Sequence, residues 1–243
     1  MNEADWDAFA ATYAAVQRES RLPIQDDVVA ALARALPLKT MRVLDLAAGS
    51  GRYALPLSRQ AKQIELLDWS QQMLTQAGAL LNQHQRQFTL THTDWTTLPP
   101  VPRADLVFVS QLPTLQPEQL PALLALTTHT LAINLQTLAA NSLITALAKQ
   151  LDLPVPVMPQ ADPAKAAALT TALTAHQWAF TTAEFRYHQT EQMAVADVLD
   201  AFDRPFSGQA ANRLAQAVGA EHANQLLPVQ EDYAFQLFII SKP

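Results

Sequence analysis

An apolar run, an acid and two closely spaced glycines follow one another in Val43-Leu44-Asp45-Leu46-Ala47-Ala48-Gly49-Ser50-Gly51-Arg52. A helical pattern begins directly afterwards, which is typical of a strand, a tight turn and a helix N-terminus in a parallel α/β sheet. Glycine at positions 49 and 51 permits a positive φ and leaves room for a ligand on the backbone. A carboxylate at Asp45 would repel a pyrophosphate and attract an ammonium group. The segment therefore predicts a nucleotide-type site for a ligand that carries positive charge.

Acids also close the next two predicted strands. Residues 63–67 predict a second strand that ends at Asp68, which lies 17 residues after Gly51. This spacing is close to that at which an acidic side chain reaches a pair of ribose hydroxyls. Asp94 and Trp95 follow a third run, residues 88–92. The order of these acids predicts that they meet at one edge of the sheet.

The chain resembles a class I S-adenosylmethionine-dependent methyltransferase in three motifs. They are residues 43–51, residues 68–74, and Thr93-Asp94-Trp95 with Leu98-Pro99 behind it. One departure from the family pattern is Ala47, which stands where the family often has its first glycine and where alanine is a common variant. The resemblance covers residues 41–135 by motif, and residues 160–241 only by the order of elements.

The resemblance implies S-adenosyl-L-methionine as the cofactor and S-adenosyl-L-homocysteine as the product. It implies that Asp45 either lies near the cofactor's amino group or orders the loop that lies near it. It also implies that Asp94 accepts a hydrogen bond from the adenine amino group. The candidate cofactor-binding residues are Asp45, Ala47, Gly49, Gly51, Asp68, Trp69, Asp94, Trp95, Ser110 and Gln111. Other interpretations stay open: Asp45 as the cap of the next helix, Asp94 as a loop cap and Trp69 as a packing residue.

The acceptor side gives weaker signals. The family's Asn/Asp-Pro-Pro-aromatic pattern is absent, and the fourth predicted strand ends in Ser110-Gln111-Leu112-Pro113. The candidate substrate residues are Tyr13, Tyr53, His188 and Arg204. Trp6, Phe9 and Tyr13 share one face of the first predicted helix, where they serve either as core or as a lid. No residue is identified as a catalytic base.

Composition limits the classes of function. The 243 residues carry a net charge of −6 without a basic run, which disfavours nucleic acid as a partner. No cysteine is present, so thiolate zinc sites and cysteine nucleophiles are excluded, and no other metal pattern is found. The acidic first residues do not form a secretory signal, and the run 131–148 is too polar to span a membrane. We expect a cytoplasmic protein with no membrane partner and a possible homodimer.

Strands alternate with helices along most of the chain, which predicts a doubly wound sheet. The expected architecture is a three-layer, Rossmann-like α/β fold with a mostly parallel seven-stranded sheet, to which the resemblance adds an antiparallel last strand. Late strands are expected at 185–189 and 233–240, and late helices at 139–150, 162–176, 191–201 and 208–219. We expect a single domain over residues 1–243. It comprises a helical lid or cap (1–38), a cofactor-binding half (39–136) and a substrate-side half (137–243).

The motifs favour transfer of a sulfonium methyl group to a small-molecule acceptor that the sequence does not identify. A base is needed only if the acceptor loses a proton of high pKa. Two alternatives remain. One is a catalytically silent S-adenosylmethionine-binding regulator or partner subunit. The other is an NAD-dependent oxidoreductase, because residues 49–54 also satisfy the pattern G-x-G-x-x-A.

Overall fold

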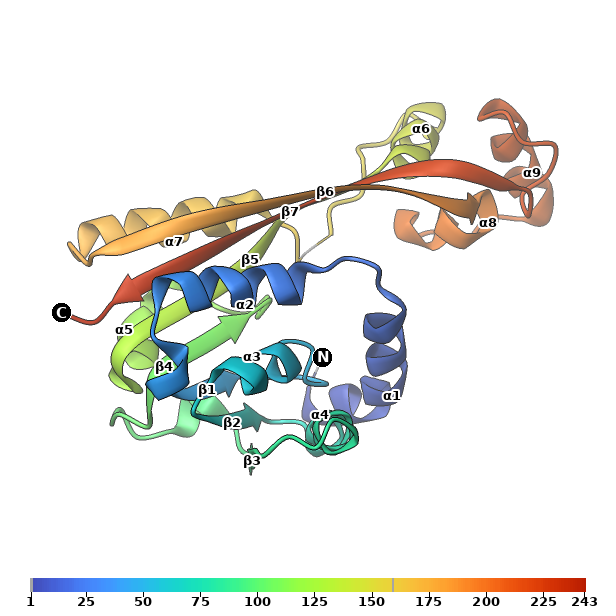
Figure 1. Ribbon diagram of the computed structural model, residues 1–243. Coiled ribbons are helices and arrows are strands. Elements are labelled where there is room, and N and C mark those ends of the chain that lie inside the picture. The colour runs from blue at the N-terminus through green and yellow to red at the C-terminus, as the bar shows by residue number, and fades with distance from the viewer. Residues whose placement is uncertain (1, 159) are drawn as a thin grey trace. The chain divides into compact units, whose positions relative to one another are not determined.

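The computed structural model describes residues 2–158 and 160–243, and seven strands in this part of the chain form one sheet (Figure 1). The strand order is β3-β2-β1-β4-β5-β7-β6. Strands β1 to β5 pair in parallel and β7 is antiparallel, which confirms the predicted fold class. The strands are β1 (Arg42–Leu46), β2 (Gln63–Asp68), β3 (Thr89–His92), β4 (Ala104–Ser110), β5 (Thr127–Asn141), β6 (Phe180–Ala194) and β7 (Leu226–Ser241).

Helices connect the parallel strands, and further helices precede the first and follow the last of these strands in the sequence. They are α1 (Glu3–Glu19), α2 (Ile24–Ala35), α3 (Ala54–Gln60), α4 (Gln71–Gln83), α5 (Leu120–Ala125), α6 (Ser142–Leu151), α7 (Pro163–Ala175), α8 (Val195–Val198) and α9 (Gly208–Ala217). Ser70 caps α4, because its hydroxyl accepts a hydrogen bond from the Met73 N–H at 3.1 Å.

The late strands are longer than the sequence predicted. Strand β5 continues to Asn141, where a helix was expected from residue 139, and β6 continues to Ala194, where a helix was expected from residue 191. Burial alternates along β6, but the half-buried positions include the polar residues Gln189 and Glu191. The Gln189 amide is paired with the buried carboxylate of Glu231 at 3.0 Å. Because polar pairs replace apolar residues on this face, the hydrophobic alternation that marks a strand is lost there.

The chain divides into two compact units. The first comprises Met1–Leu135, Lys165–Phe185 and Gln236–Pro243, and the second comprises Gln136–Ala164 and Arg186–Phe235. The core of the second unit is formed by buried apolar side chains of α6, α8 and α9 and the segments around them. The expected single domain over residues 1–243 stays a prediction.

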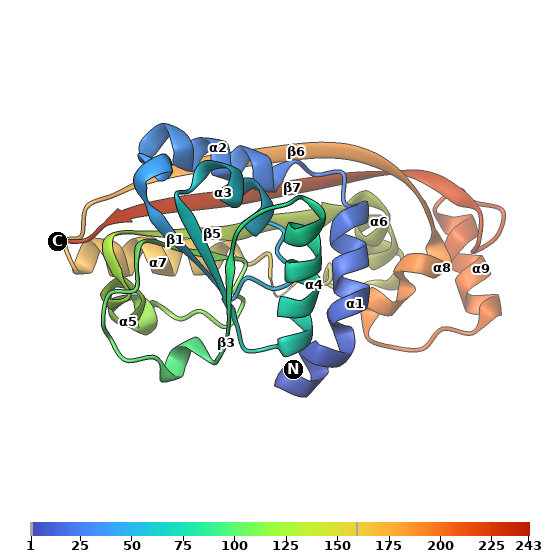
Figure 2. The same cartoon turned by 60° about the horizontal axis from the view of Figure 1, so that its bottom comes forward.

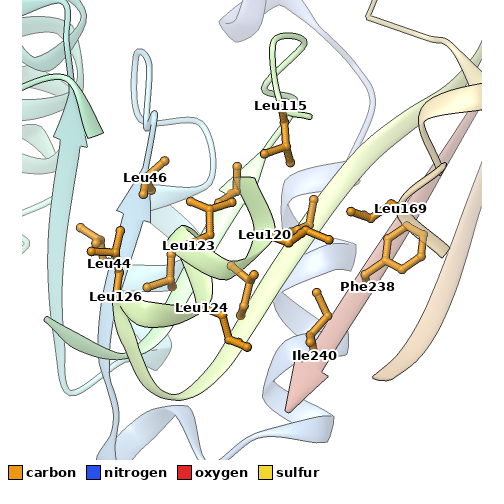
Figure 3. Close-up of a cluster of buried hydrophobic side chains, with 14 of the residues drawn as sticks. Leu44, Leu46, Leu115, Leu120, Leu123, Leu124, Leu126, Leu169, Phe238 and Ile240 are labelled. Carbon is orange, nitrogen blue, oxygen red and sulfur yellow. The ribbon is translucent and has the colours of Figure 1, made fainter. Parts of the chain in front are cut away.

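In the first unit, side chains of each strand alternate between the two faces of the sheet. Leu44 and Leu46 of β1 point into a core formed with the apolar side chains of α5 and α7 (Figure 3). Asp45 belongs to the opposite face, where the ring of Phe108 in β4 contacts that of Tyr53 with centroids 5.3 Å apart. Helix α1 lies beside α4 in this unit (Figure 2). Asp45 thus lies on the face away from α5, whereas the candidates Ala47 and Trp95 pack against the core that contains α5.

Candidate active site

The loop after β1 adopts left-handed backbone at three positions. The φ angles are +57° at Ala47, +53° at Gly49 and +86° at Gly51. A Cβ atom at Gly51 would lie 2.9 Å from the Cβ of Ala77, so glycine there also lets the loop approach α4 closely. Ala47 holds the same type of conformation with a side chain, which costs about 1–2 kcal/mol. The loop geometry therefore accounts for both glycines and leaves local strain at Ala47.

A cavity of about 280 Å³ opens beside this loop in the first unit. Its walls come from the ends of β1, β2 and β4 and from helix α1. This is the carboxyl edge of the parallel strands, where open α/β sheets bind ligands. The lining residues are Trp6, Tyr13, Gln17, Asp45, Ala47, Ala48, Gly49, Arg52, Tyr53, Asp68, Trp69, Met73, Ser110, Gln111, Leu112, Pro113 and Thr114.

The cavity brings together most of the candidates selected from the sequence. Those that line it are Asp45, Ala47, Gly49, Asp68, Trp69, Ser110 and Gln111 among the cofactor candidates, and Tyr13 and Tyr53 among the substrate candidates. Gly51, Asp94 and Trp95 belong to the same unit but are not part of the lining. Asp94 caps a short helical turn by accepting a hydrogen bond from the Thr96 N–H at 2.9 Å. Its adenine-binding role stays a prediction.

The other two substrate candidates belong to the second unit. The His188 ring is exposed and pairs with Asp232 at 2.6 Å, and the Arg204 guanidinium lies 4.9 Å from the centre of the Phe206 ring. Both contacts are compatible with structural roles, and substrate binding by these residues stays a prediction. Over residues 2–158 and 160–243, no group of three or more acidic or histidine side chains is placed to hold a metal ion. No helix within those ranges is long and apolar enough to cross a membrane.

Asp45 is the most unusual ionisable group of the cavity. Its side chain is 2% exposed, and its Oδ2 atom has no hydrogen-bond partner in the structure. Burial, and secondly the charge of Asp68, raise its pKa to about 8. A buried oxygen without a partner is energetically unfavourable, so the site favours a ligand that brings a donor or a positive charge.

Asp68 is held firmly at the end of β2. Its Oδ2 atom accepts a hydrogen bond from the Gly49 N–H at 2.8 Å, and its Oδ1 atom accepts one from the Ser70 N–H at 2.9 Å. Burial raises the pKa of Asp68, while these backbone N–H groups act in the opposite direction. Each carboxylate oxygen has a second lone pair, so the group can still accept hydrogen bonds from a ligand.

A polar cluster lies at the end of β4 and at the neighbouring position in the middle of β5. The Tyr53 phenol oxygen accepts hydrogen bonds from the Gln111 amide at 3.2 Å and from the Asn134 amide at 3.1 Å. The same Asn134 amide donates to the Ser110 hydroxyl at 3.1 Å. Gln111 has a positive φ of 51°, and backbone strain of this kind is common at functional sites. Neutral polar groups therefore form this end of the cavity.

Helix α1 forms one wall and is held by its own side chains. The Asp7 carboxylate accepts hydrogen bonds from the Ser70 hydroxyl at 2.6 Å and from the Gln72 N–H at 3.0 Å, which places it over the N-terminus of α4. Gln17 accepts a hydrogen bond from the Ser50 hydroxyl at 2.7 Å. The rings of Trp6, Phe9 and Tyr13 form one cluster, and Trp6 and Tyr13 line the cavity.

Sequence reasoning missed several of these residues. Asn134 gave a signal that could have been used, because it is a polar residue inside the apolar run of a central parallel strand. Asp7 gave none, because its partners Ser70 and Gln72 are more than 60 positions away in the sequence. Helix α2 buries its apolar face and contacts α3, and the role of residues 1–38 as a lid or cap stays a prediction.

Residues 43–133 match a family model described as a methyltransferase domain. None of the curated proteins compared with the chain matches it in sequence.

Solved structures share the fold. A putative methyltransferase from Bacillus halodurans C-125 is 14% identical with a TM-score of 0.57, and the alignment covers 89% of this chain and 99% of that one. Magnesium protoporphyrin IX methyltransferase from Synechocystis PCC 6803, with bound SAM, is 15% identical with a TM-score of 0.51, covering 89% and 77%. The DhpI–SAH complex is 21% identical with a TM-score of 0.51, covering 74% and 87%. Residues 43–133 thus match a methyltransferase-domain family, and the chain shares the fold of these solved structures.

Proposed function

We propose that the cavity beside the glycine loop binds S-adenosyl-L-methionine and that the chain transfers the methyl group to a small-molecule acceptor. S-adenosyl-L-homocysteine is the second product. The observation that carries this proposal is the buried Asp45 oxygen without a hydrogen-bond partner at the end of β1. A ligand with an ammonium group satisfies it, whereas a dinucleotide pyrophosphate would bring like charge to the same place.

The remaining walls fit the rest of such a ligand. Asp68 has lone pairs available for a ribose hydroxyl pair, and Trp69 and Met73 offer apolar surface beside it. We assign Ala47 and Gly49 to the backbone cradle, and Ser110 and Gln111 to the end of the cavity where methyl donor and acceptor meet. Asp94 and Trp95 are proposed to contact the adenine. Gly51 acts through the close packing of the loop on α4.

When bound, S-adenosylmethionine supplies a sulfonium methyl group, which leaves as the C–S bond breaks and a new bond forms to the acceptor. The chain's own contribution is to bind, to align and to exclude water. Trp6 and Tyr13 of α1 close one side of the cavity, and Tyr53 with its amide partners shapes the opposite end. No catalytic base is assigned. The leaving group needs no protonation, and a base is required only if the acceptor is a weak acid that must lose a proton.

A small-molecule acceptor is favoured by charge and by lining. The net charge of −6 is unfavourable for nucleic acid, and the cavity wall from Ser110 to Thr114 carries no charged side chain. Magnesium protoporphyrin IX methyltransferase, a structural neighbour, is named for a small-molecule substrate. The cytoplasmic location and a homodimer stay predictions from the sequence.

Calorimetric titration with S-adenosylhomocysteine tests the proposal, with NADH as a parallel ligand. We expect saturable binding of S-adenosylhomocysteine, weakened about tenfold to a hundredfold in Asp68→Ala, because charge-assisted hydrogen bonds to the ligand are lost. Glu65→Ala is the matched control, since Glu65 lies on the same strand and outside the lining. Binding of NADH alone would refute the proposal. Binding without turnover on any acceptor in a screen would identify a silent cofactor-binding protein.

A further inference from the structure

A second cavity of about 280 Å³ lies on the other side of the glycine loop in the first unit. Three guanidinium groups line it, those of Arg18, Arg52 and Arg59, and Asp26 is the one carboxylate among its described lining residues. The chain as a whole has a net charge of −6, so this cavity reverses the overall sign. It shares Gln17 and Arg52 with the candidate active site.

Arg52 is fixed in place by neutral groups. Its Nε atom donates to the Gln25 amide oxygen at 2.9 Å, and its Nη2 atom donates to the Ser20 hydroxyl at 3.2 Å and to the Leu22 carbonyl at 3.1 Å. None of these acceptors carries charge. The half-buried positive charge is therefore hydrogen-bonded but not neutralised by these partners, which favours an anion beside it.

Arg18 and Arg59 add charge at the mouth of the same cavity. Both side chains are exposed, and within the described residues neither forms a hydrogen bond or an ion pair. Guanidinium groups bind oxyanions with paired, directional hydrogen bonds. Donors from three separate positions suit a tetrahedral anion with three or four acceptor oxygens better than a planar carboxylate with two.

The rest of the cavity suits an organic group attached to such an anion. Its wall includes apolar surface from Ala14, Leu55, Pro56 and Leu80. We propose that this cavity binds a small phosphorylated metabolite, with Arg18, Arg52 and Arg59 as the phosphate ligands. The Ser50 hydroxyl of the glycine loop belongs to the same lining and bonds to Gln17, so the two cavities share a rigid wall.

Calorimetric titration with inorganic pyrophosphate at constant ionic strength tests the site. We expect saturable binding to the native chain and binding weakened at least about tenfold in Arg18→Gln/Arg59→Gln, since each lost guanidinium removes charge-assisted hydrogen bonds. The control is Arg34→Gln/Lys39→Gln, which removes the same charge from exposed side chains outside the lining. If pyrophosphate binding is weakened equally in both double variants, the weakening is due to net charge alone and the proposed site is wrong. Absence of binding to the native chain would also overturn the proposal.

Two further measurements fix the location and the ligand class. In Asp68→Ala, pyrophosphate binding is expected to persist even though S-adenosylhomocysteine binding is weakened, so the two proposals can fail separately. Tighter pyrophosphate binding in that variant would place the anion beside the lost carboxylate in the active-site cavity and overturn the proposal. Citrate serves as a carboxylate probe, and tighter binding of citrate than of pyrophosphate would contradict a phosphate site. Arg59→Glu, with the thermal midpoint as a check on folding, repeats the test with a single substitution.

Discussion

The Asn134 side-chain amide donates a hydrogen bond to the phenol oxygen of Tyr53 at 3.1 Å, and Asn134 is fully buried. Gln111 donates to the same oxygen, so the phenol accepts two hydrogen bonds and keeps its own proton to donate. Burial raises the pKa of Tyr53, which keeps the phenol protonated at neutral pH. The pair therefore fixes a neutral phenol in the wall of the cavity.

Removing this pair should destabilise the first unit. Tyr53→Phe is expected to lower the free energy of unfolding by about 1–2 kcal/mol, because buried amide donors lose their acceptor. In a double-mutant cycle with Asn134→Ala, we expect a coupling energy of about 1 kcal/mol from urea denaturation. Strictly additive effects would show that the two side chains do not interact. Tyr13→Phe, a half-buried phenol outside this cluster, is the control.

Asp45 should make the stability of the free protein depend on pH. Its folded pKa of about 8 lies above the ordinary aspartate pKa of 3.8, so between these values the folded state binds more protons than the unfolded state. Stability from this group is complete at low pH and decreases by up to about 1.4 kcal/mol per pH unit as the pH rises towards 8. Asp45→Asn should flatten this slope in denaturation curves and stabilise the ligand-free chain above neutrality.

The same substitution should weaken ligand binding. Because the ammonium group of the ligand favours the ionised carboxylate, affinity of the native chain for S-adenosylhomocysteine is expected to increase between pH 6 and 8. In Asp45→Asn the affinity should be lower, and much of this pH dependence should be lost. Asp68 still contributes to the pH dependence that remains. A steep increase unchanged in Asp45→Asn would assign the pH dependence to another group.

Ala47 offers a test of the strained loop. With φ at +57°, Ala47→Gly relieves a strain of about 1–2 kcal/mol, partly offset by the greater freedom of glycine in the unfolded chain. We therefore expect the variant to be as stable as the native chain or more stable by up to about 1 kcal/mol. Ala48→Gly, at a position without positive φ, should destabilise. Thermal unfolding measures the difference in stability between Ala47→Gly and Ala48→Gly. Equal destabilisation by the two substitutions would contradict the strain at Ala47.

The fold could be predicted where hydrophobic patterns agree with local signals. Strands β1, β2 and β4 each contain a cluster of buried apolar residues, and Ser70 marks the start of α4. The ends of β5 and β6 could not be predicted, because their half-buried positions carry polar residues that find partners on distant strands. Glu231 illustrates this, since the Asn141 and Gln189 amides both donate to its carboxylate.

The candidate site divides in the same way. Asp45, Gly49 and Asp68 stand next to strand ends, so their sequence spacing reports their position in space, and all three line the cavity. The roles of Asn134 and Asp7 depend on pairings between segments far apart in the chain. These contacts depend on the packing of α1 against α4 and on the pairing of β4 with β5. No local sequence pattern encodes either arrangement.

Helix α1 should control how fast the ligand leaves. Asp7 bonds to Ser70 and Gln72, which lowers the pKa of Asp7, the Ser70 hydroxyl being the larger cause. Because the folded pKa lies below the unfolded value of 3.8, this contact is kept at neutral pH and is lost on acidification below that value. Asp7→Ala should therefore loosen α1 at neutral pH, as acid does in the native chain.

Two measurements check this role of α1. Amide protons of α1 should exchange faster with solvent in Asp7→Ala, and S-adenosylhomocysteine should dissociate several-fold faster in stopped-flow displacement, since Trp6 and Tyr13 line the cavity. Glu19→Ala, on the exposed last turn of the same helix, is the control and should change neither rate. If exchange increases while the dissociation rate stays the same, α1 covers the site without gating it, and the aromatic residues act as a fixed wall.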